Sequence, residues 1–147
     1  MKLSTKTRYG IRAILELGMH HGKGPLQTKI IAQRQNISVK YLEQLMSILK
    51  AGGFVRSIRG AKGGYILSIN PNQISLLELF RALEGPLVTV ECLENNNYCS
   101  QRADCIAREL WSEMQEAIKQ VLSSTNLQDL LDKAERKSKE KVSDYQI

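Results

Sequence analysis

The 147-residue sequence has few cysteines, few histidines, few aromatic residues and no long uninterrupted apolar run. Without about 20 consecutive apolar residues, no transmembrane helix is expected. The first residues lead directly into a helical pattern with no apolar core or cleavage site of a signal peptide. We therefore expect a cytoplasmic protein with no membrane partner. Three cysteines are an odd number, which argues against a closed disulfide framework in a reducing compartment.

Acidic residues are nearly absent from the first 62 positions. This stretch carries twelve Lys or Arg and only two acids, Glu16 and Glu43, for a net charge of +10, whereas residues 63–147 have a net charge of −4. A basic half so poor in acids favours a polyanionic partner, most simply nucleic acid. An ordinary solvated basic surface is the alternative that charge alone leaves open.

Sequence features of enzymes are also missing. There is no Ser–His–Asp set, and the glycine-rich stretch over 59–64 lacks the Gly-x-x-x-x-Gly-Lys-Ser/Thr pattern of a nucleotide-binding loop. The chain is therefore not expected to be an enzyme. An electron-transfer protein or redox enzyme is the alternative from another functional class, but a basic N-terminal half would have no purpose there.

Apolar residues recur at helical spacing over about residues 5–20, 27–35 and 39–50. The turn before the third helix ends at Ser38, a favourable N-cap. Two helices joined by so short a turn predict a helix-turn-helix, with the second helix in the major groove. A plain helical bundle is the alternative. The candidate base readers are Ser38, Lys40, Tyr41 and Gln44.

Two short β-prone runs, 54–58 and 65–69, flank the basic, glycine-rich stretch 59–64. A hairpin of this kind directly after a helix-turn-helix predicts a wing. Its glycines let the backbone approach a phosphate closely, and Arg59 and Lys62 would reach the DNA backbone or minor groove. A surface hairpin whose glycines only turn the chain is the alternative.

The C-terminal half predicts a helix over about 76–83, a polar loop, and a long amphipathic helix from about 106. The apolar stripe of that long helix comprises Ile106, Leu110, Trp111, Met114, Ala117, Ile118, Val121 and Leu122. A lone helix cannot bury this stripe, so a symmetric dimer is expected, with packing inside one chain as the alternative. A short helix is predicted to end near residue 134, followed by a charged, disordered tail.

The predicted fold is mostly α with a small β-hairpin wing: a winged helix-turn-helix plus a long C-terminal dimerisation helix. The chain divides into a DNA-binding domain (1–85), a cysteine cluster-binding loop (86–105), the dimerisation helix with a short terminal helix (106–134) and a disordered tail (135–147).

All three cysteines, Cys92, Cys99 and Cys105, fall within fourteen residues of that loop. Three soft thiolates on one short segment can hold an iron–sulfur cluster. They can also hold zinc with one further ligand, although the usual Cys-x-x-Cys pair is absent. A reversible disulfide between two of them is the third possibility. The residues alone leave these three open.

The sequence resembles the IscR-type regulators, a family of winged-helix iron–sulfur transcription factors that includes IscR and NsrR. The matching stretches are Met1 to Lys6 with Arg8-Tyr9, Ile37-Ser38 with Tyr41 to Leu45, Arg59-Gly60-x-x-Gly63-Gly64-Tyr65, and the three cysteines followed by Leu110-Trp111. Together they cover about residues 1–125, in the order of the family.

The resemblance implies a homodimer on palindromic promoter DNA, controlled by an iron–sulfur cluster and regulating cluster-assembly genes. The cluster would be held by Cys92, Cys99 and Cys105, and Glu43 would join the four other reading-helix residues and Arg59 at the DNA. A cysteine-metabolism regulator without a cluster, a thiol switch and a zinc-stabilised DNA-binding protein are the alternatives.

The fourth ligand departs from the family pattern. IscR has a histidine three positions after its last cysteine, where this chain has Arg108, which stays charged and cannot ligate. The first spacer between cysteines is also one residue longer. The fourth ligand is therefore unknown, and Glu43 is one candidate because it would join the reading helix to the cluster. Arg8, shared with IscR, favours 2Fe–2S over 4Fe–4S. The other candidates are Asp104, Glu109, His20, His21 or an exogenous small molecule.

Overall fold

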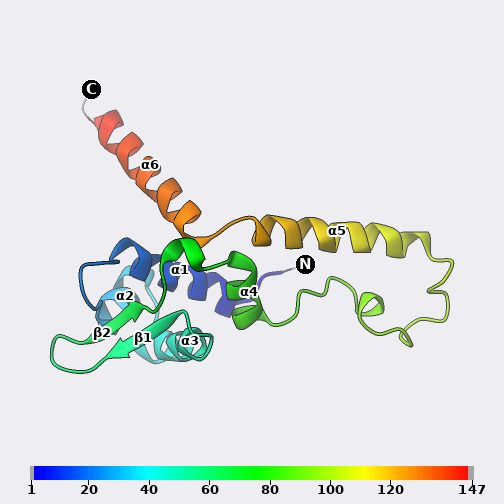
Figure 1. Ribbon diagram of the computed structural model, residues 1–147, viewed down its shortest axis with the longest axis horizontal. Helices are drawn as coiled ribbons and strands as arrows, with labels where there is room; N and C mark the ends of the chain where they lie inside the picture. The colour runs from blue at the N-terminus through cyan, green and yellow to red at the C-terminus, as the bar shows by residue number, and fades with distance from the viewer. Residues whose placement is uncertain (1, 146–147) are drawn as a thin grey trace.

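Across residues 2–145, which the computed structural model describes, four helices and a two-stranded hairpin form a body from which two longer helices extend (Figure 1). The helices are α1 (Thr5–Met19), α2 (Thr28–Gln35), α3 (Val39–Ala51), α4 (Leu76–Glu84), α5 (Ile106–Ser123) and α6 (Leu127–Tyr145). The strands are β1 (Val55–Ile58) and β2 (Gly64–Leu67), and two short 3-10 helices cover Pro71–Gln73 and Glu91–Leu93. The predicted mostly helical fold with a small β-hairpin is confirmed. No helix in the described range is long and apolar enough to cross a membrane.

The core lies between α1, α3 and α4 and is closed by the hairpin. Its side chains come from the apolar faces of the helices, which the three- and four-residue spacing predicts. The largest fully buried side chains include Ile14, Ile31, Leu42, Leu45, Met46, Leu49, Ile74, Leu79, Leu83 and Leu127. Leu127 belongs to α6, so the start of the last helix is also part of this core.

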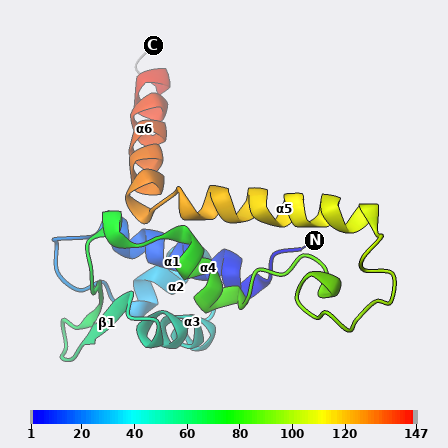
Figure 2. The same ribbon diagram turned by 45° about the vertical axis from the view of Figure 1, so that its right-hand side comes forward.

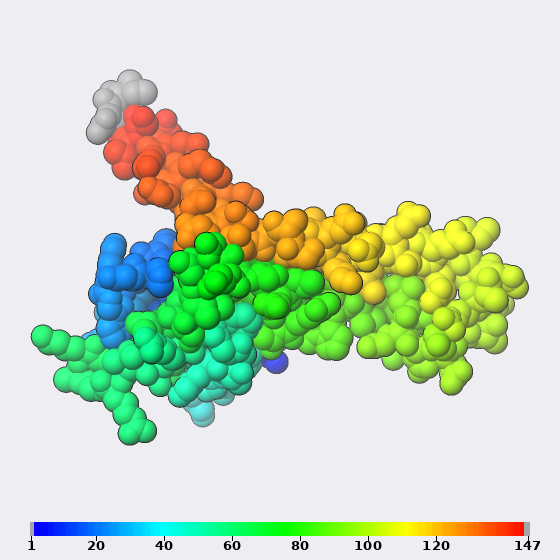
Figure 3. Space-filling view, viewed as in Figure 1, coloured from blue at the N-terminus to red at the C-terminus, as the bar shows by residue number. Residues whose placement is uncertain are grey.

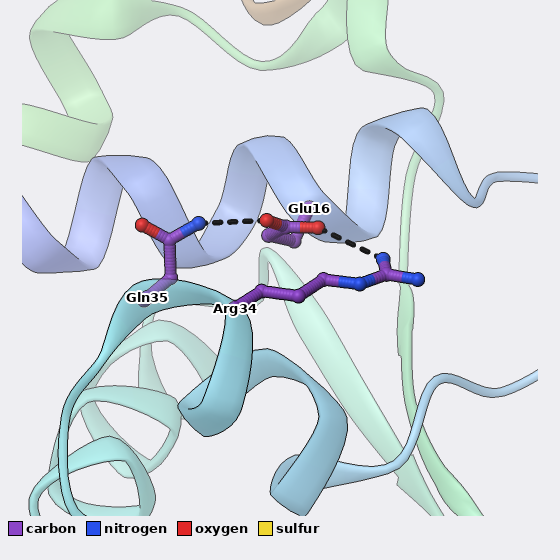
Figure 4. A network of polar contacts seen from close by, with 3 residues as sticks. All are labelled: Glu16, Arg34 and Gln35. Atoms are coloured by element: carbon purple, nitrogen blue, oxygen red, sulfur yellow. Dashed lines mark hydrogen bonds and ion pairs between the residues drawn. The ribbon is translucent and has the colours of Figure 1, made fainter.

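A buried carboxylate ties α1 to α2. Glu16 is only 7% exposed, and it forms an ion pair with Arg34 at 3.1 Å and accepts a hydrogen bond from the Gln35 amide at 2.6 Å (Figure 4). Buried charges require such partners, because desolvation otherwise favours the neutral form. One of the two acids in the basic half of the chain therefore serves the fold.

The hairpin is antiparallel, with Ser57 opposite Tyr65 and Ile58 opposite Gly64. Its two adjacent glycines are required by close backbone approach. A Cβ atom on Gly63 would lie 2.1 Å from the carbonyl oxygen of Ile58, and one on Gly64 would lie 2.2 Å from that of Leu26. The Gly-Gly pair therefore brings the second strand against both the first strand and the linker before α2.

The junction between α5 and α6 is attached to the start of α4 through the main chain. The Leu76 amide donates to the Thr125 carbonyl at 3.0 Å, and the Leu127 amide donates to the Ile74 carbonyl at 2.9 Å. These bonds form a short antiparallel bridge around Ser75. The C-terminal end of α5 is thereby held to the body, while its N-terminal end lies far from this attachment (Figures 1 and 2).

The last helix is longer than predicted. It continues to Tyr145, so the predicted end near 134 and the predicted disorder are wrong for residues 135–145; residues 146 and 147 lie outside the described range. The tail is poor in apolar residues, which suggests disorder, but its Lys, Glu, Arg and Ala are strong helix formers. Glu135 and Lys139 add an ion pair at helical spacing, 3.0 Å long.

Candidate nucleic-acid interface and cysteine segment

The solvent-facing side of α3 carries most of the predicted base readers. Ser38 caps the helix by accepting a hydrogen bond from the Tyr41 amide at 3.0 Å, which orients the first turn. Lys40, Glu43 and Gln44 are exposed on the helix that follows. The opposite side of α3 is buried in the core, so these side chains face away from the protein.

Tyr41 has a second role that the sequence does not reveal. Its ring packs edge-on against Tyr9 of α1, with ring centroids 6.2 Å apart, and the guanidinium of Arg12 lies 5.0 Å from the Tyr9 ring centroid. Arg12 is exposed. The start of the predicted reading helix is therefore braced by α1, and Arg12 adds a positive charge beside it that helical periodicity alone does not assign to this surface.

The tip of the hairpin is exposed, including Arg59 and Lys62. The hairpin and α3 lie on one side of the molecule, and α6 lies on the opposite side (Figures 1 and 2). We call the exposed residues of α3 together with residues 59–62 the reading face. It brings the two predicted DNA-binding elements to one side.

Two side-chain hydrogen bonds join the hairpin to α3. The Lys50 ammonium donates to the Ser57 hydroxyl at 3.2 Å, and the Tyr65 hydroxyl donates to the Glu43 carboxylate at 3.1 Å. Partial burial, followed by the negative charge of Glu43, raises the pKa of Tyr65 above its usual value. The Tyr65 hydroxyl therefore keeps its proton and stays a donor at neutral pH. Sequence analysis did not assign Tyr65 a role at this surface.

The cysteine segment, residues 86–105, runs beside the N-terminal part of α5 (Figure 1). The Thr89 amide donates to the Gln115 side chain at 3.0 Å, and the Arg108 guanidinium donates to the Cys92 carbonyl at 3.4 Å. Arg108, which occupies the position of the missing histidine ligand, therefore ties the first cysteine to α5. The segment and α5 form an arm that extends from the body (Figure 3).

The three cysteines are free thiols at different depths: Cys92 and Cys105 are half-buried and Cys99 is exposed. Within residues 2–145, no three His, Cys, Asp or Glu side chains lie close enough together to hold a metal ion. The structure therefore does not assemble the predicted ligand set. Nor does it bring Glu43 to the cysteines, since that carboxylate is hydrogen-bonded to Tyr65 on the reading face.

Helix α5 has three faces. One face packs against α4 and the cysteine segment and is half-buried, with Trp111, Gln115, Ile118 and Leu122. The second is polar and exposed. The third is apolar but exposed, with Ile106 at 81%, Leu110 at 51%, Met114 at 45% and Val121 at 64%. The predicted apolar stripe is thus divided: its own domain covers one half and leaves the other half bare.

Known proteins share this arrangement. The Rrf2 family, described as "Iron-dependent Transcriptional regulator", matches residues 3–133. The chain is 48% identical over 130 residues to the HTH-type transcriptional regulator CymR of Bacillus subtilis, covering 88% of this chain and 89% of that protein.

Two solved structures have the same fold. The structure of CymR (YrzC), the global cysteine regulator of B. subtilis, has a TM-score of 0.78 and 46% identity, covering 90% of this chain and 97% of that one. The T. potens IscR structure has a TM-score of 0.74 and 38% identity, covering 91% and 88%. These relatives are transcriptional regulators, not enzymes. They confirm both the predicted winged-helix fold and the resemblance to IscR-type proteins, and the chain belongs to the Rrf2 family of DNA-binding transcriptional regulators.

Proposed function

We propose that this regulator binds a palindromic promoter site as a homodimer and that an iron–sulfur cluster on the cysteine segment controls its affinity. The observation that carries this proposal is the position of the segment. It connects α4 of the DNA-binding body directly to α5, the helix with a bare apolar face. A change in the segment therefore acts on the junction between the reading heads and the dimer.

The bare face of α5 supports the homodimer. Four large apolar side chains follow one stripe over four turns, and they are between 45% and 81% exposed. Exposed apolar stripes of this length are typical of helix–helix interfaces. A second copy offers the same stripe, so a two-fold axis beside α5 buries both. Two heads related by a two-fold axis match a palindromic operator.

The chemistry of the donors supports the cluster. Cys92, Cys99 and Cys105 are thiols on one segment, two of them sheltered and one open to solvent. When bound, a cluster would supply an oxidant-sensitive centre held by these three residues. Gathering them requires the segment to rearrange beside α5, and a coupling of about 1–3 kcal/mol is enough to regulate occupancy of a promoter. We propose 2Fe–2S, on the strength of the resemblance to IscR, and cluster-assembly genes as targets.

Anaerobic purification tests the cluster directly. We expect a coloured protein whose visible absorbance disappears on chelation, with iron and acid-labile sulfide in comparable amounts. Cys99→Ala should lose the absorbance and change operator affinity without unfolding the protein, whereas the neighbouring Ser100→Ala should change neither. Absorbance retained in Cys99→Ala would contradict the ligand assignment, and protein that accepts no sulfide on reconstitution would contradict the cluster.

A second candidate function is a regulator of cysteine metabolism that holds no cluster. It is favoured by the 48% identity to B. subtilis CymR and by the separation of the three cysteines in the structure. A colourless protein that binds its operator equally well after all three cysteines are replaced by alanine supports this function. Zinc in the purified protein, or operator binding that depends on a reversible disulfide, identifies the two remaining alternatives.

A further inference from the structure

The basic half of the chain has only two carboxylates, and they have different environments. Glu16 is buried and paired with Arg34 and Gln35 inside the body. Glu43 is exposed on the reading face. A carboxylate there is repelled by DNA phosphates. It is compatible with a DNA interface when it accepts a hydrogen bond from a base, and in the major groove the amino group of cytosine is such a donor.

The orientation of the Glu43 carboxylate is set by one contact. The Tyr65 hydroxyl donates to its Oε2 at 3.1 Å. The ion pairs found within residues 2–145 are Arg34–Glu16 and Lys139–Glu135, so no basic side chain in that range competes for Glu43. A carboxylate accepts several hydrogen bonds, so the remaining lone pairs of Glu43 stay available to a base.

Tyr65 is itself held in place from two sides. Its backbone amide and carbonyl both pair with Leu26, each at 3.0 Å. Across the hairpin it faces Ser57, whose hydroxyl accepts a hydrogen bond from Lys50 at 3.2 Å. Glu43 and Lys50 are two turns apart on α3 and lie on the same side of the helix. The two contacts therefore lock one face of the hairpin against the reading helix, but only the Tyr65 contact reaches a candidate base reader.

We propose that Tyr65 is a specificity-determining positioning residue: its hydroxyl holds the Glu43 carboxylate in the orientation that selects a cytosine in each half-site. This inference rests on the proposed role of α3 as the reading helix. Tyr65 itself need not touch DNA. Its hydroxyl removes the rotational freedom of an exposed glutamate, so that the acid discriminates between bases instead of only repelling phosphates.

Selection from a random duplex library with the full-length protein supplies the test. We expect the wild type to recover a palindrome with a C·G pair at one position of each half-site, and Glu43→Ala to recover the same site with that position relaxed. Tyr65→Phe should lower the preference for that pair by roughly three- to tenfold. Its thermal midpoint, and the preferences at all other positions, should stay those of the wild type.

Three further variants separate positioning from packing. Ser57→Ala removes the other hairpin-to-α3 contact and should leave base preference unchanged. Tyr9→Phe, which removes a tyrosine hydroxyl elsewhere in the same domain, should do the same. In the Glu43→Ala background, Tyr65→Phe should have no further effect, because the residue it positions is gone.

The inference is overturned if Tyr65→Phe keeps wild-type discrimination, if Ser57→Ala changes it equally, or if the Tyr65→Phe effect persists without Glu43. It is also overturned if Glu43→Ala selects the wild-type site without relaxation. A wild-type protein that enriches no sequence contradicts the proposed function itself, which is a different result from normal enrichment with an inert Tyr65.

Discussion

At the residue scale, one carboxylate joins the two ends of the DNA-binding body. Glu84, at the end of α4, accepts hydrogen bonds from the Ser4 hydroxyl at 2.6 Å, the Ser4 amide at 3.3 Å and the Thr7 hydroxyl. Ser4 is also the N-cap of α1. Hydrogen bonds from the Ser4 and Thr7 side chains lower the pKa of Glu84, because they favour its charged form.

This contact predicts a defined pH dependence of stability. Because the pKa of Glu84 is lower in the folded protein than in the unfolded chain, its contribution is fully present above the unfolded value of about 4.3. The contribution is lost as the pH falls through the lowered folded value. Glu84→Gln should therefore be less stable than the wild type at pH 6, and the difference should shrink toward pH 3.

Urea unfolding midpoints measured across this range check the prediction. Glu140→Gln, which removes an exposed carboxylate on α6, serves as the control and should follow the wild type throughout. A Glu84→Gln difference that is constant from pH 6 to pH 3 would show that charge on Glu84 does not contribute.

Much of the reading face is visible in the sequence because it depends on local rules. Ser38 is recognisable as a cap from its position before an apolar repeat, and Lys40 and Gln44 follow from the polar side of that repeat. The Tyr65–Glu43 contact is not visible in this way. It joins residues 22 positions apart, and it exists only after the hairpin folds back onto α3.

At the scale of elements, the exposed stripe of α5 gives a direct test of the dimer. Leu110 is 51% exposed on the apolar face, whereas Ser112 is exposed on the polar face of the same helix. Leu110→Glu places a charge in the proposed interface and should produce a monomer with poor operator affinity. Ser112→Glu adds the same charge outside the interface and should remain a dimer.

Sedimentation of the two variants separates the outcomes. If Leu110→Glu still sediments as a dimer, another surface holds the two copies together. Circular dichroism should show the same helix content in both variants, because the substituted side chains are exposed and glutamate is a good helix former.

Helix bounds were predicted well where an apolar repeat ends at a cap or a glycine, as for α3 between Ser38 and Gly52. They were predicted poorly for α6, whose second half has no apolar repeat to follow. The division of the α5 stripe was also beyond sequence reasoning. Periodicity shows that both halves are apolar, but only the packed structure shows which half α4 and the cysteine segment cover.

At the scale of the whole molecule, charge is separated along the chain. The first 62 residues have a net charge of +10 and include the whole reading face, while the remainder has a net charge of −4. Operator affinity should therefore fall steeply with salt, with a slope of log K against log salt of about −0.9 per neutralised phosphate. Binding isotherms at several salt concentrations measure this slope.

Two matched variants locate the charges responsible. Arg59→Ala, on the hairpin tip, should weaken binding and reduce the slope by roughly one per wing contact. Arg136→Ala, on α6, removes the same charge from the side opposite the reading face and should leave the slope unchanged. Equal effects would show that total charge, not the reading face, determines binding.

The arrangement of the cysteines is the part of the whole-molecule prediction that the structure leaves as a proposal. The sequence places three thiols on one polar segment, and the structure keeps them on that segment beside α5 without bringing them together. Their spacing limits which ligand sets are possible. It does not specify a fold for the segment, because a polar loop has no apolar pattern that selects one conformation.

The link between α4 and the α5–α6 junction has an evolutionary consequence. Main-chain amides and carbonyls make that link, so it does not depend on which side chains occupy its positions. Relatives can diverge there without detaching the arm, provided that proline does not replace Leu76 or Leu127 and remove a donor. Operator preference and effector response can then drift independently, since the joint between them tolerates change.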